Sequence, residues 1–585
     1  MKMVKRKYGF ALGASAVLLA GLATGCSGND NEGASPSASQ SESAPASSTA
    51  AASGSASASS GSASAAPTQD LTPVTYTINT TDDKLNWESP ITKKLTEKTG
   101  VSLKYDLTVG DQFQKWDLWL ASNDYPDIIS LDPKYTQKYK DAGAIIPLGD
   151  LIDQYGPHIK EKFGKYYNLL KDKDGKIYAL YNVNASQEAS PDATGSFIIQ
   201  QDVLKEAGYP QVKTLDQLYE LIKAYKEKHP KIEGKDTIGF AAAMLSYTMN
   251  ISFNNPIVSS NGWPDNGNFK VQDNGDVNYI PVTEDAKSYY KFLNKLYRDG
   301  LFDKEAFSLD SIQGKISQGR VIAAYAPGWF LGDSEKALRA AGKPGSTYAH
   351  LPIYANESVE DHSNAMTPTA GGGLSWTISA GAKHPERIIQ FIDYLFSDEG
   401  QVLTQWGIEG EDYTVQGGKR TVADGLLAQR SSDPDVDYKR GFKSTGTGGA
   451  PWFGIGNGAK LADGDYATPL TKDSVVQTYD DTTKATLAAY GKQVWADFLP
   501  PVNFVPGYLW QLTPPETVKV QQQKIDDAWR KNLPKIVMSK SDDEFEGAWS
   551  TMVGSIQKSG LDDMNKAYTQ LWADFNATYE STIGG

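Results

Sequence analysis

Apolar and polar positions alternate in blocks along the chain after residue 70, and strand patterns take turns with helix patterns. Val74 to Thr80 alternates with a period of two, which predicts a strand, and Val101 to Val109 repeats that pattern. Between them, Ser89 and Pro90 form a helix start signal and Gly100 a stop signal. A second helix near Phe113 to Ala121 and a strand from Asp127 to Leu131 follow. This order predicts an α/β fold with a largely parallel, two-sided sheet, in which ligands bind beyond the carboxyl ends of the strands.

Later segments carry hairpin and helix signals. Asp174-Gly175 and Asn274-Gly275 lie between apolar residues and predict tight hairpin turns. The Gly-rich stretch 441–458 predicts an irregular loop, and the chain from Asp526 onward predicts helices that pack with their Trp, Tyr and Leu side chains. Further helices are expected at 202–207, at 215–225 with Thr214 as cap, at 293–297 ending at Gly300, and at 388–396.

The first 70 residues have a different composition. Basic residues precede a short apolar run from Tyr8 to Leu22, which is the pattern of an export signal. The run ends in Ala23-Thr24-Gly25-Cys26, which resembles a bacterial lipobox, in which the cysteine is diacylated after cleavage. An ordinary signal peptide is the alternative, but it leaves a secreted protein with one free thiol. We therefore expect a lipoprotein signal peptide at 1–25, and a lipid-anchored, disordered Ser/Ala-rich tether at 26–70.

Composition narrows the function. The formal charge of −14 argues against nucleic acid as a partner. After the first 22 residues no apolar run is long enough to span a membrane, so we expect the acyl chains on Cys26 to be the only membrane attachment. Cys26 is the single cysteine, so no intrachain disulfide forms. The chain has 13 Trp, 31 Tyr and 19 Phe in an otherwise polar sequence, which indicates a need for flat, amphipathic surfaces.

Catalytic and metal-binding patterns are missing from the sequence. Neither a nucleotide-binding Gly-x-x-x-x-Gly-Lys loop nor, in the folded part, a Gly-x-Ser-x-Gly elbow occurs. Asp172 and Asp174 resemble the start of a calcium loop, but a hairpin turn explains them better. We therefore expect no cofactor, no metal and no enzymatic activity, although a catalytic carboxylate pair stays open because it is defined by a distance. The histidines are scattered and form no zinc motif: His158, His229, His350, His362 and His384.

Four segments resemble those of extracellular solute-binding proteins of family 1, a group that includes maltose-binding protein. They are Leu120 to Ile129, Asp174 to Leu180, Gly319 to Trp329, and Lys383 to Gly400, in that order. The resemblance implies a two-lobed, type II periplasmic-binding-protein-like fold, with a largely parallel, helix-flanked sheet in each lobe, a hinge, and a helical C-terminal region. It also implies a monomer that captures a carbohydrate, an oligosaccharide in our interpretation. By the same resemblance, the protein is expected to deliver the sugar to the permease subunits of an ABC importer with a separate ATPase, at the outer face of a Gram-positive cell membrane.

The resemblance further implies lobe boundaries and site residues. Lobe 1 is expected at 71–183 and about 370–407, and lobe 2 at 184–369 and about 408–585. Asp83 and Lys84 match an Asp-Lys pair that binds sugar hydroxyls, Asp132 a carboxylate at a strand end, and Glu188 a carboxylate between the lobes.

Tryptophan supplies the remaining candidates. Trp329 follows Pro327-Gly328 after an apolar strand, where an indole can stack on the apolar face of a sugar. Trp87, Trp263 and Trp452 lie among Asn, Gly, Pro and Asp and are expected to line the same cleft. Five other tryptophans lie in apolar or helical patterns and are assigned to the core instead of the site: Trp376, Trp495, Trp529, Trp549 and Trp572.

Two alternatives to a sugar importer remain at this point. The same fold can bind a peptide, a metal chelate or a polyol, or serve as a sensory receptor. A lipid-anchored glycosidase with two carboxylates is the other alternative.

Overall fold

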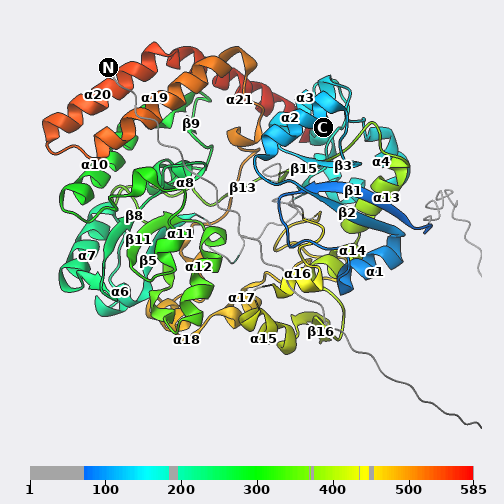
Figure 1. The fold of residues 1–585 in the computed structure, drawn as a ribbon, viewed down its shortest axis with the longest axis horizontal. Helices are drawn as coiled ribbons and strands as arrows, with labels where there is room; N and C mark the ends of the chain where they lie inside the picture. The colour runs from blue at the N-terminus through cyan, green and yellow to red at the C-terminus, as the bar shows by residue number, and fades with distance from the viewer. Residues whose placement is uncertain are drawn as a thin grey trace, which may run out of the picture. The chain divides into compact units, whose positions relative to one another are not determined.

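Two four-stranded sheets, each with its own hydrophobic core, organise the protein into two lobes (Figure 1). The computed structural model describes residues 71–183, 191, 195–367, 369–370, 374–433, 435–446 and 453–583. No helix in this part of the chain is long and apolar enough to cross a membrane.

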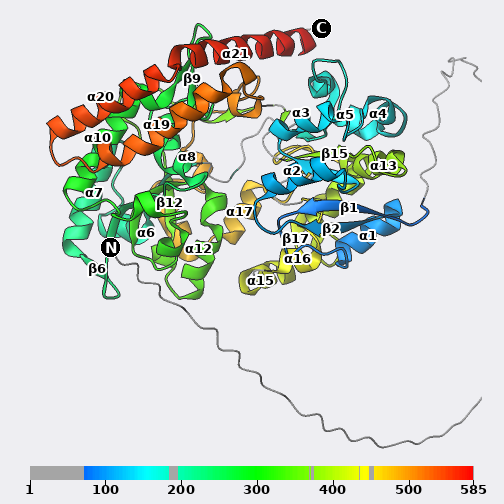
Figure 2. The ribbon, with the colours of Figure 1, turned by 45° about the horizontal axis from the view of Figure 1, so that its top comes forward.

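The sheet of lobe 1 has the order β15-β3-β1-β2, in which β1 is parallel to β2 and β3 while β15 is antiparallel to β3. The alternation of Ile128 and Ile129 places their side chains in cores on opposite faces of the sheet, with α1 and α13 on the first face and α2 and α3 on the second (Figure 2). The elements of this lobe are β1 (Val74–Thr80), α1 (Pro90–Thr99), β2 (Val101–Leu107), α2 (Gln112–Ser122), β3 (Ile128–Leu131), α3 (Pro133–Asp141), α4 (Gly149–Tyr155), α5 (Pro157–Phe163), η1 (Gly164–Leu170), β15 (Ser375–Ile378), α13 (Pro385–Phe396) and α14 (Asp398–Gln401).

Helix α1 has the boundaries that its sequence signals predict. The Ser89 hydroxyl accepts a hydrogen bond from the Thr92 amide, Pro90 opens the helix, and Gly100 closes it with a left-handed φ of 69°. A Cβ at Gly100 would lie 2.6 Å from the Leu71 carbonyl oxygen and 2.8 Å from Arg387 Nη2. Glycine is therefore required both by the backbone angle and by the space.

Gly100→Ala is expected to lower the free energy of unfolding by about 3 kcal/mol, from a left-handed alanine and a steric clash together. Gly143→Ala is the matched control, because Gly143 has a φ of 67° but open space around the added Cβ, and it should cost about 1 kcal/mol. Denaturant unfolding measures both. Equal losses would mean that the clash is relieved without cost.

The sheet of lobe 2 has the order β12-β5-β11-β8. Here β11 is parallel to β8, but β5 is antiparallel to both of its neighbours, so two of the three pairings are antiparallel. The largely parallel sheet expected in each lobe is therefore correct for lobe 1 and wrong for lobe 2. The elements are β5 (Ser196–Gln200), α6 (Gln201–Glu206), α7 (Leu215–Lys228), β8 (Ile238–Ala241), α8 (Thr248–Phe253), α9 (Asn255–Ser260), β9 (Phe269–Val271), β10 (Val277–Tyr279), α10 (Glu284–Arg298), α11 (Gln313–Ile316), β11 (Val321–Ala326), α12 (Gly328–Ala340) and β12 (Tyr348–Leu351).

The reversed strands are those by which the chain enters a lobe from the other one. The first residue of β5, Ser196, pairs with Ala326 at the end of β11, and the first residue of β15, Ser375, pairs with Leu131 at the end of β3. A strand that starts where its neighbours end must run against them. The chain therefore passes between the lobes at the carboxyl edge of both sheets.

Short strand pairs join the crossing segments. β4 (Asn182–Val183) pairs with β14 (Thr369–Ala370), and β13 (Ala365–Met366) pairs with β18 (Asn503–Phe504). Phe453, Ile455 and Leu461 are buried in the core of lobe 1, whereas Leu487 is buried in that of lobe 2. We therefore propose that the boundary expected near residue 408 lies between Ala467 and Leu487. The segment up to this boundary contains β16 (Tyr413–Gln416), β17 (Lys419–Val422), α15 (Asp424–Ser432) and α16 (Val436–Arg440).

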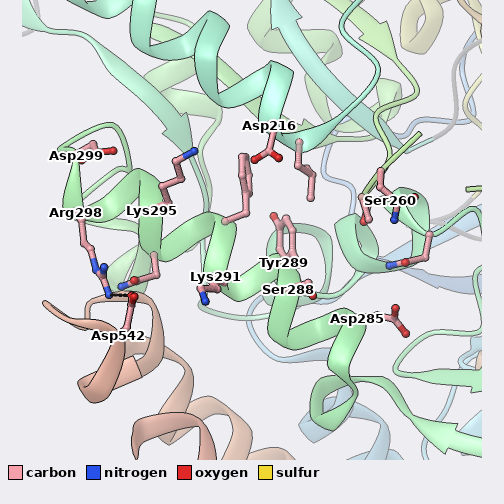
Figure 3. Close-up of a pocket in the computed structure, with 16 residues that line it drawn as sticks. Asp216, Ser260, Asp285, Ser288, Tyr289, Lys291, Lys295, Arg298, Asp299 and Asp542 are labelled. Atoms are coloured by element: carbon pink, nitrogen blue, oxygen red, sulfur yellow. Dashed lines mark hydrogen bonds and ion pairs between the residues drawn. The ribbon is translucent and has the colours of Figure 1, made fainter. Parts of the chain in front are cut away.

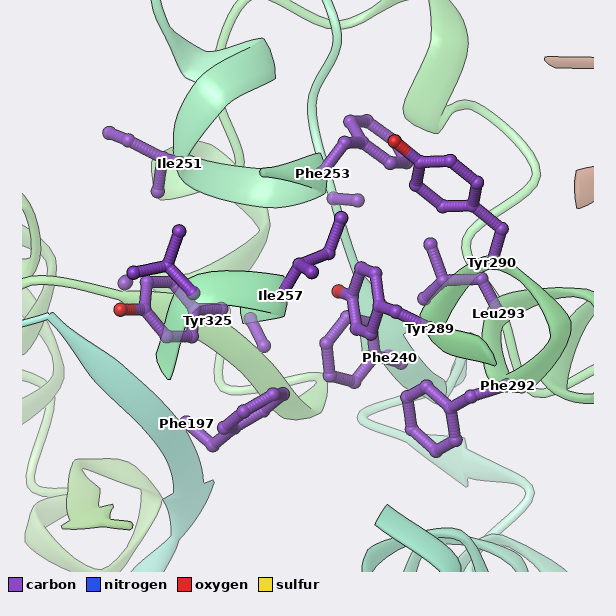
Figure 4. Close-up of a cluster of buried hydrophobic side chains, with 14 of the residues drawn as sticks. Phe197, Phe240, Ile251, Phe253, Ile257, Tyr289, Tyr290, Phe292, Leu293 and Tyr325 are labelled. Atoms are coloured by element: carbon purple, nitrogen blue, oxygen red, sulfur yellow. The ribbon is translucent and has the colours of Figure 1, made fainter. Parts of the chain in front are cut away.

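The core of lobe 2 is rich in aromatic side chains. Phe240 packs edge-on against Phe292 with ring centroids 5.9 Å apart, and Phe197, Ile257 and Tyr289 surround them (Figure 4). Three C-terminal helices extend this core, as the sequence predicts. All five tryptophans assigned to the core are buried, which confirms that assignment. The remaining helices are α17 (Lys472–Thr478), α18 (Asp481–Ala489), α19 (Lys519–Val537), α20 (Asp542–Lys558) and α21 (Leu561–Ile583).

The ion pair of His158 with Asp393 makes part of the stability of lobe 1 depend on pH. His158 Nδ1 lies 2.7 Å from Asp393 Oδ2, and this hydrogen bond raises the pKa of His158 above its usual 6.5. Because the pKa is higher in the folded state, the stabilisation is complete below about pH 6.5 and is lost as the pH rises through the folded pKa.

We expect the difference in Tm between the wild type and His158→Gln to shrink as the pH is raised from about 5.5 to 8.5. Thermal unfolding across this range measures it, with His362→Gln, on an exposed loop, as the control. A difference that stays constant with pH would assign His158 a packing role instead.

Candidate binding site

The carboxyl edges of the two sheets hold four of the eight predicted ligand-binding residues. Asp83 and Lys84 follow β1, Asp132 follows β3, and Trp329 follows β11. These edges are also where the crossing segments enter and leave the lobes. The topology therefore places residues from both lobes around one region, as ligand sites of open α/β sheets require.

Trp329 presents its indole to solvent. It lies in the first turn of α12 rather than in a loop, is 71% exposed, and contacts Phe330 edge-on at a centroid distance of 5.9 Å. Asp333 lies one helical turn later and so on the same face of α12. This face of the helix therefore offers a flat apolar plane beside a carboxylate.

A polar network at the end of β1 lies opposite that helix face. Lys84 donates a hydrogen bond to Asp435 at 2.8 Å, and its ammonium group lies 5.4 Å above the ring of Tyr438. The Tyr438 hydroxyl donates to Asp82 at 2.8 Å. Asp82 also accepts a hydrogen bond from the Lys84 amide, which fixes the turn. Asp83 is exposed beside this network.

The charge of Asp333 on α12 acts on two groups of this network, Lys84 and Tyr438. Burial raises the pKa of Tyr438 to about 12, together with the Asp82 hydrogen bond and the charges of Asp82, Asp333 and Asp435. The hydrogen bond to Asp435 is the largest cause of the raised pKa of Lys84, and the negative charge of Asp333 raises this pKa further. Asp333 of lobe 2 is therefore close enough for its charge to act on Lys84 and Tyr438 of lobe 1.

The other predicted residues have different surroundings. Asp132 is the N-cap of α3 and accepts a hydrogen bond from the Lys134 amide at 2.9 Å. Trp87 packs against the core of lobe 1 and donates its indole N–H to Thr96, which favours a packing role. Glu188, Trp452 and Cys26 lie outside the described residues.

Trp263 is half-buried in lobe 2, and its ring is covered by Lys270 at 3.8 Å from the centroid. One face of this indole is therefore already occupied by a side chain of the protein.

Two exposed aromatic residues in lobe 2 were missed by the sequence analysis. Tyr247, which follows β8, is 60% exposed, and Trp510, which follows β18, is 44% exposed. Trp510 stacks on Tyr508 with centroids 5.5 Å apart and planes within 6°, and its indole N–H donates to the Asp265 carbonyl. The signal for this pair was present, because Pro506-Gly507-Tyr508 repeats the Pro-Gly-aromatic pattern that identified Trp329.

Asp265 lies beside this aromatic pair. Its side chain is open to solvent and accepts a hydrogen bond from the Gly267 amide at 2.9 Å, yet burial by the surrounding protein raises its pKa. The pKa of Tyr508 rises to about 12, through burial and the charge of Asp265. The Tyr508 hydroxyl donates to the Ala365 carbonyl, which ties the pair to a segment that crosses between the lobes.

A cavity on the flank of lobe 2 contains none of the predicted residues. It has a volume of about 600 Å³ and lies between α7 and α10, next to the 2.7 Å ion pair of Arg298 and Asp542 (Figure 3).

Within the described ranges no three His, Cys, Asp or Glu side chains are grouped to hold a metal ion. His350, the buried histidine, contacts Ser196 at 2.9 Å, and burial lowers its pKa to about 4.

Comparison with known proteins identifies the family. The sequence pattern described as bacterial extracellular solute-binding protein matches residues 77–402, more than half of the chain. The protein therefore belongs to this family of binding proteins, which confirms the resemblance seen in its sequence.

Similar proteins include the fructooligosaccharide ABC transporter substrate-binding protein FusA of Streptococcus pneumoniae, with 27% identity over 56% of this chain and 61% of the relative. The polygalacturonan/rhamnogalacturonan-binding protein YtcQ of Bacillus subtilis is 23% identical over 50% of this chain and 57% of the relative. The matched regions span about three fifths of these relatives.

Solved structures share the fold. The alginate-binding protein AlgQ2 matches with a TM-score of 0.60 and 20% identity over 86% of this chain and 99% of that one. FusA in complex with kestose matches with a TM-score of 0.61 and 19% identity over 86% and 100%. The two-lobed, periplasmic-binding-protein-like fold predicted from the sequence is thereby confirmed.

Proposed function

We propose that this protein captures a carbohydrate, an oligosaccharide, between its two lobes and delivers it to an ABC importer. The observation that carries the proposal is the pairing of exposed aromatic planes with carboxylates in lobe 2, where Trp329 follows β11 at the carboxyl edge of the sheet. Trp329 and Asp333 lie on one helix face, the charge of Asp333 acts on the Lys84 network, and Trp510 lies beside Asp265.

This combination suits the chemistry of sugars. A pyranose or furanose ring has apolar C–H faces that pack on aromatic planes, and hydroxyl groups that donate hydrogen bonds to carboxylates. Carboxylate acceptors form hydrogen bonds about twice as strong as neutral acceptors do. Micromolar affinity corresponds to about 8 kcal/mol, within reach of two or three stacked rings and several such bonds.

Closure of the lobes follows from the position of these groups. Contacts that form on both lobes at once stabilise the closed arrangement, because a ligand shifts an equilibrium by its differential affinity for the two states. The permease subunits then recognise the closed protein, and a separate ATPase drives transport. The family membership and the names of FusA and YtcQ support this role.

Attachment through diacylated Cys26 completes the proposal. Two acyl chains form a durable anchor, which would hold the monomer at the outer face of the membrane of a Gram-positive cell, near its importer. The composition of residues 27–69, mostly Ser, Ala and Gly, supports a tether between the lipid and the folded lobes.

Thermal unfolding of the purified protein against a ligand panel tests this function. The panel contains plant, algal and host oligosaccharides, with amino acids, peptides and metal salts as controls. We expect one glycan class to raise Tm, and the rise to grow with concentration as mass action requires. A shift with a peptide or another non-sugar solute alone would keep the fold and replace the substrate, and release of shortened glycans would instead identify a glycosidase.

A further inference from the structure

We propose that the site selects a neutral glycan and discriminates against glycans rich in uronic acid. This inference rests on the proposed function and specifies its substrate class. The relatives do not decide the matter, because fructooligosaccharides are neutral whereas polygalacturonan and alginate carry a carboxylate on most of their sugar units. The charges of this chain's own site residues must decide it.

In lobe 2, the segments that present the aromatic planes carry no positive charge. These are 242–247 with Tyr247, 259–268 with Asp265, 327–333 with Trp329, and 500–511 with Trp510. Their only charged residues are Asp265 and Asp333, and Lys270, two residues beyond the second segment, covers the ring of Trp263. A uronate stacked on any of these aromatic planes would meet carboxylates and no lysine or arginine from the same segment.

In lobe 1, the lysines at the sheet edge already have acidic or aromatic neighbours. Lys84 is bound to Asp435 at 2.8 Å, and Lys115 lies 5.3 Å above the ring of Trp119. The charge of Lys134 acts on the buried carboxylate of Asp526 in α19. A ligand carboxylate would have to displace the Asp435 carboxylate to gain Lys84.

A lysine on the Trp329 face of α12, two helical turns after Trp329, also has an acidic neighbour. Lys336 lies 3.7 Å from Asp333, one turn along the helix. Cations are therefore scarce among the residues at the sheet edges, while Asp82, Asp83 and Asp132 add negative charge to the lobe 1 side.

The physical consequence is a selective repulsion. Two like charges about 4 Å apart repel each other appreciably at the effective dielectric constant of about 20 near a protein surface. A uronate would also lose hydration without a guanidinium partner to bind it in bidentate fashion. Neutral hydroxyl groups, in contrast, donate directly to the same carboxylates. The acidic residues at the sheet edges thus repel glycans rich in uronic acid and bind neutral glycans.

Titration calorimetry of the full-length protein tests the inference with oligosaccharides of matched length. Neutral trimers and tetramers of fructose, glucose, galactose and xylose are compared with galacturonate and mannuronate oligomers at low salt. We expect at least one neutral series to bind ten-fold or more tightly than every uronate. Uronate binding that equals or exceeds neutral binding would overturn the inference and leave the carbohydrate function intact. Silence with both classes would contradict the proposed function, and the inference with it.

Charge variants separate the electrostatic mechanism from shape selection. The double substitution Asp265→Asn and Asp333→Asn should narrow the preference for the neutral ligand at least three-fold, whereas Asp150→Asn on α4 changes the net charge without changing the preference. Raising the ionic strength to about 0.5 M should also reduce the ratio of neutral to uronate affinity, because salt screens the repulsion. A preference that is unaffected by both the double substitution and salt would refute discrimination by charge.

Discussion

Replacing Trp329 with alanine is expected to weaken binding of the stabilising glycan ten-fold or more, which is about 1.4 kcal/mol. The indole is 71% exposed and packs on little except the edge of Phe330, so its removal costs the folded protein little. It lies on the helix face next to Asp333, whose charge reaches Lys84 and Tyr438 of the other lobe. A sugar ring on this plane would be held from both lobes.

Titration calorimetry of Trp329→Ala and Trp329→Phe, with thermal unfolding as a folding check, measures this effect. The phenylalanine variant should retain part of the affinity because it keeps a flat apolar surface. Val520→Ala on α19, which also removes an exposed apolar side chain (63%), should bind like the wild type. Unchanged affinity in Trp329→Ala would remove this residue from the site.

Replacing Trp510 with alanine is expected to have a comparable effect, again ten-fold or more in affinity. Its ring is held in place on one side by Tyr508 and by a hydrogen bond to the Asp265 carbonyl, and it is open to solvent on the other. A plane that is already ordered before binding loses little conformational entropy when a sugar stacks on it. Removing it therefore forfeits most of the stacking free energy.

Trp510→Phe separates the aromatic plane from the indole hydrogen bond. If the plane matters, the phenylalanine variant binds within about three-fold of the wild type while the alanine variant does not. Both must keep the wild-type Tm to within a few degrees. Equal losses in the two variants would point to displacement of Asp265, because both lack the hydrogen bond to its carbonyl.

Local signals predicted much of the fold. Ser89, Pro90 and Gly100 located α1 to the residue, because caps and left-handed glycines act within a single turn. The reversal of β5 could not be read in the same way. Strand direction depends on where the chain enters the sheet, and the hydrophobic pattern of a strand is the same in both directions.

The site shows the same division between local and tertiary information. Trp329 was predicted from three consecutive residues, and the structure leaves it exposed. Trp87 has similar polar neighbours in the sequence, yet its ring packs with Tyr105 and Phe391, which are distant along the chain. Asp265 is one of 71 acidic residues, and only the folded chain sets it beside Tyr508 and Trp510.

The most direct test is a crystal structure of the protein with the glycan that stabilises it most. We expect sugar rings packed on Trp329 and Trp510, hydroxyl groups within hydrogen-bond distance of Asp265, and residues of both lobes in contact with the ligand. A glycan bound instead in the cavity between α7 and α10, with the sheet edges empty, would contradict it (Figure 3).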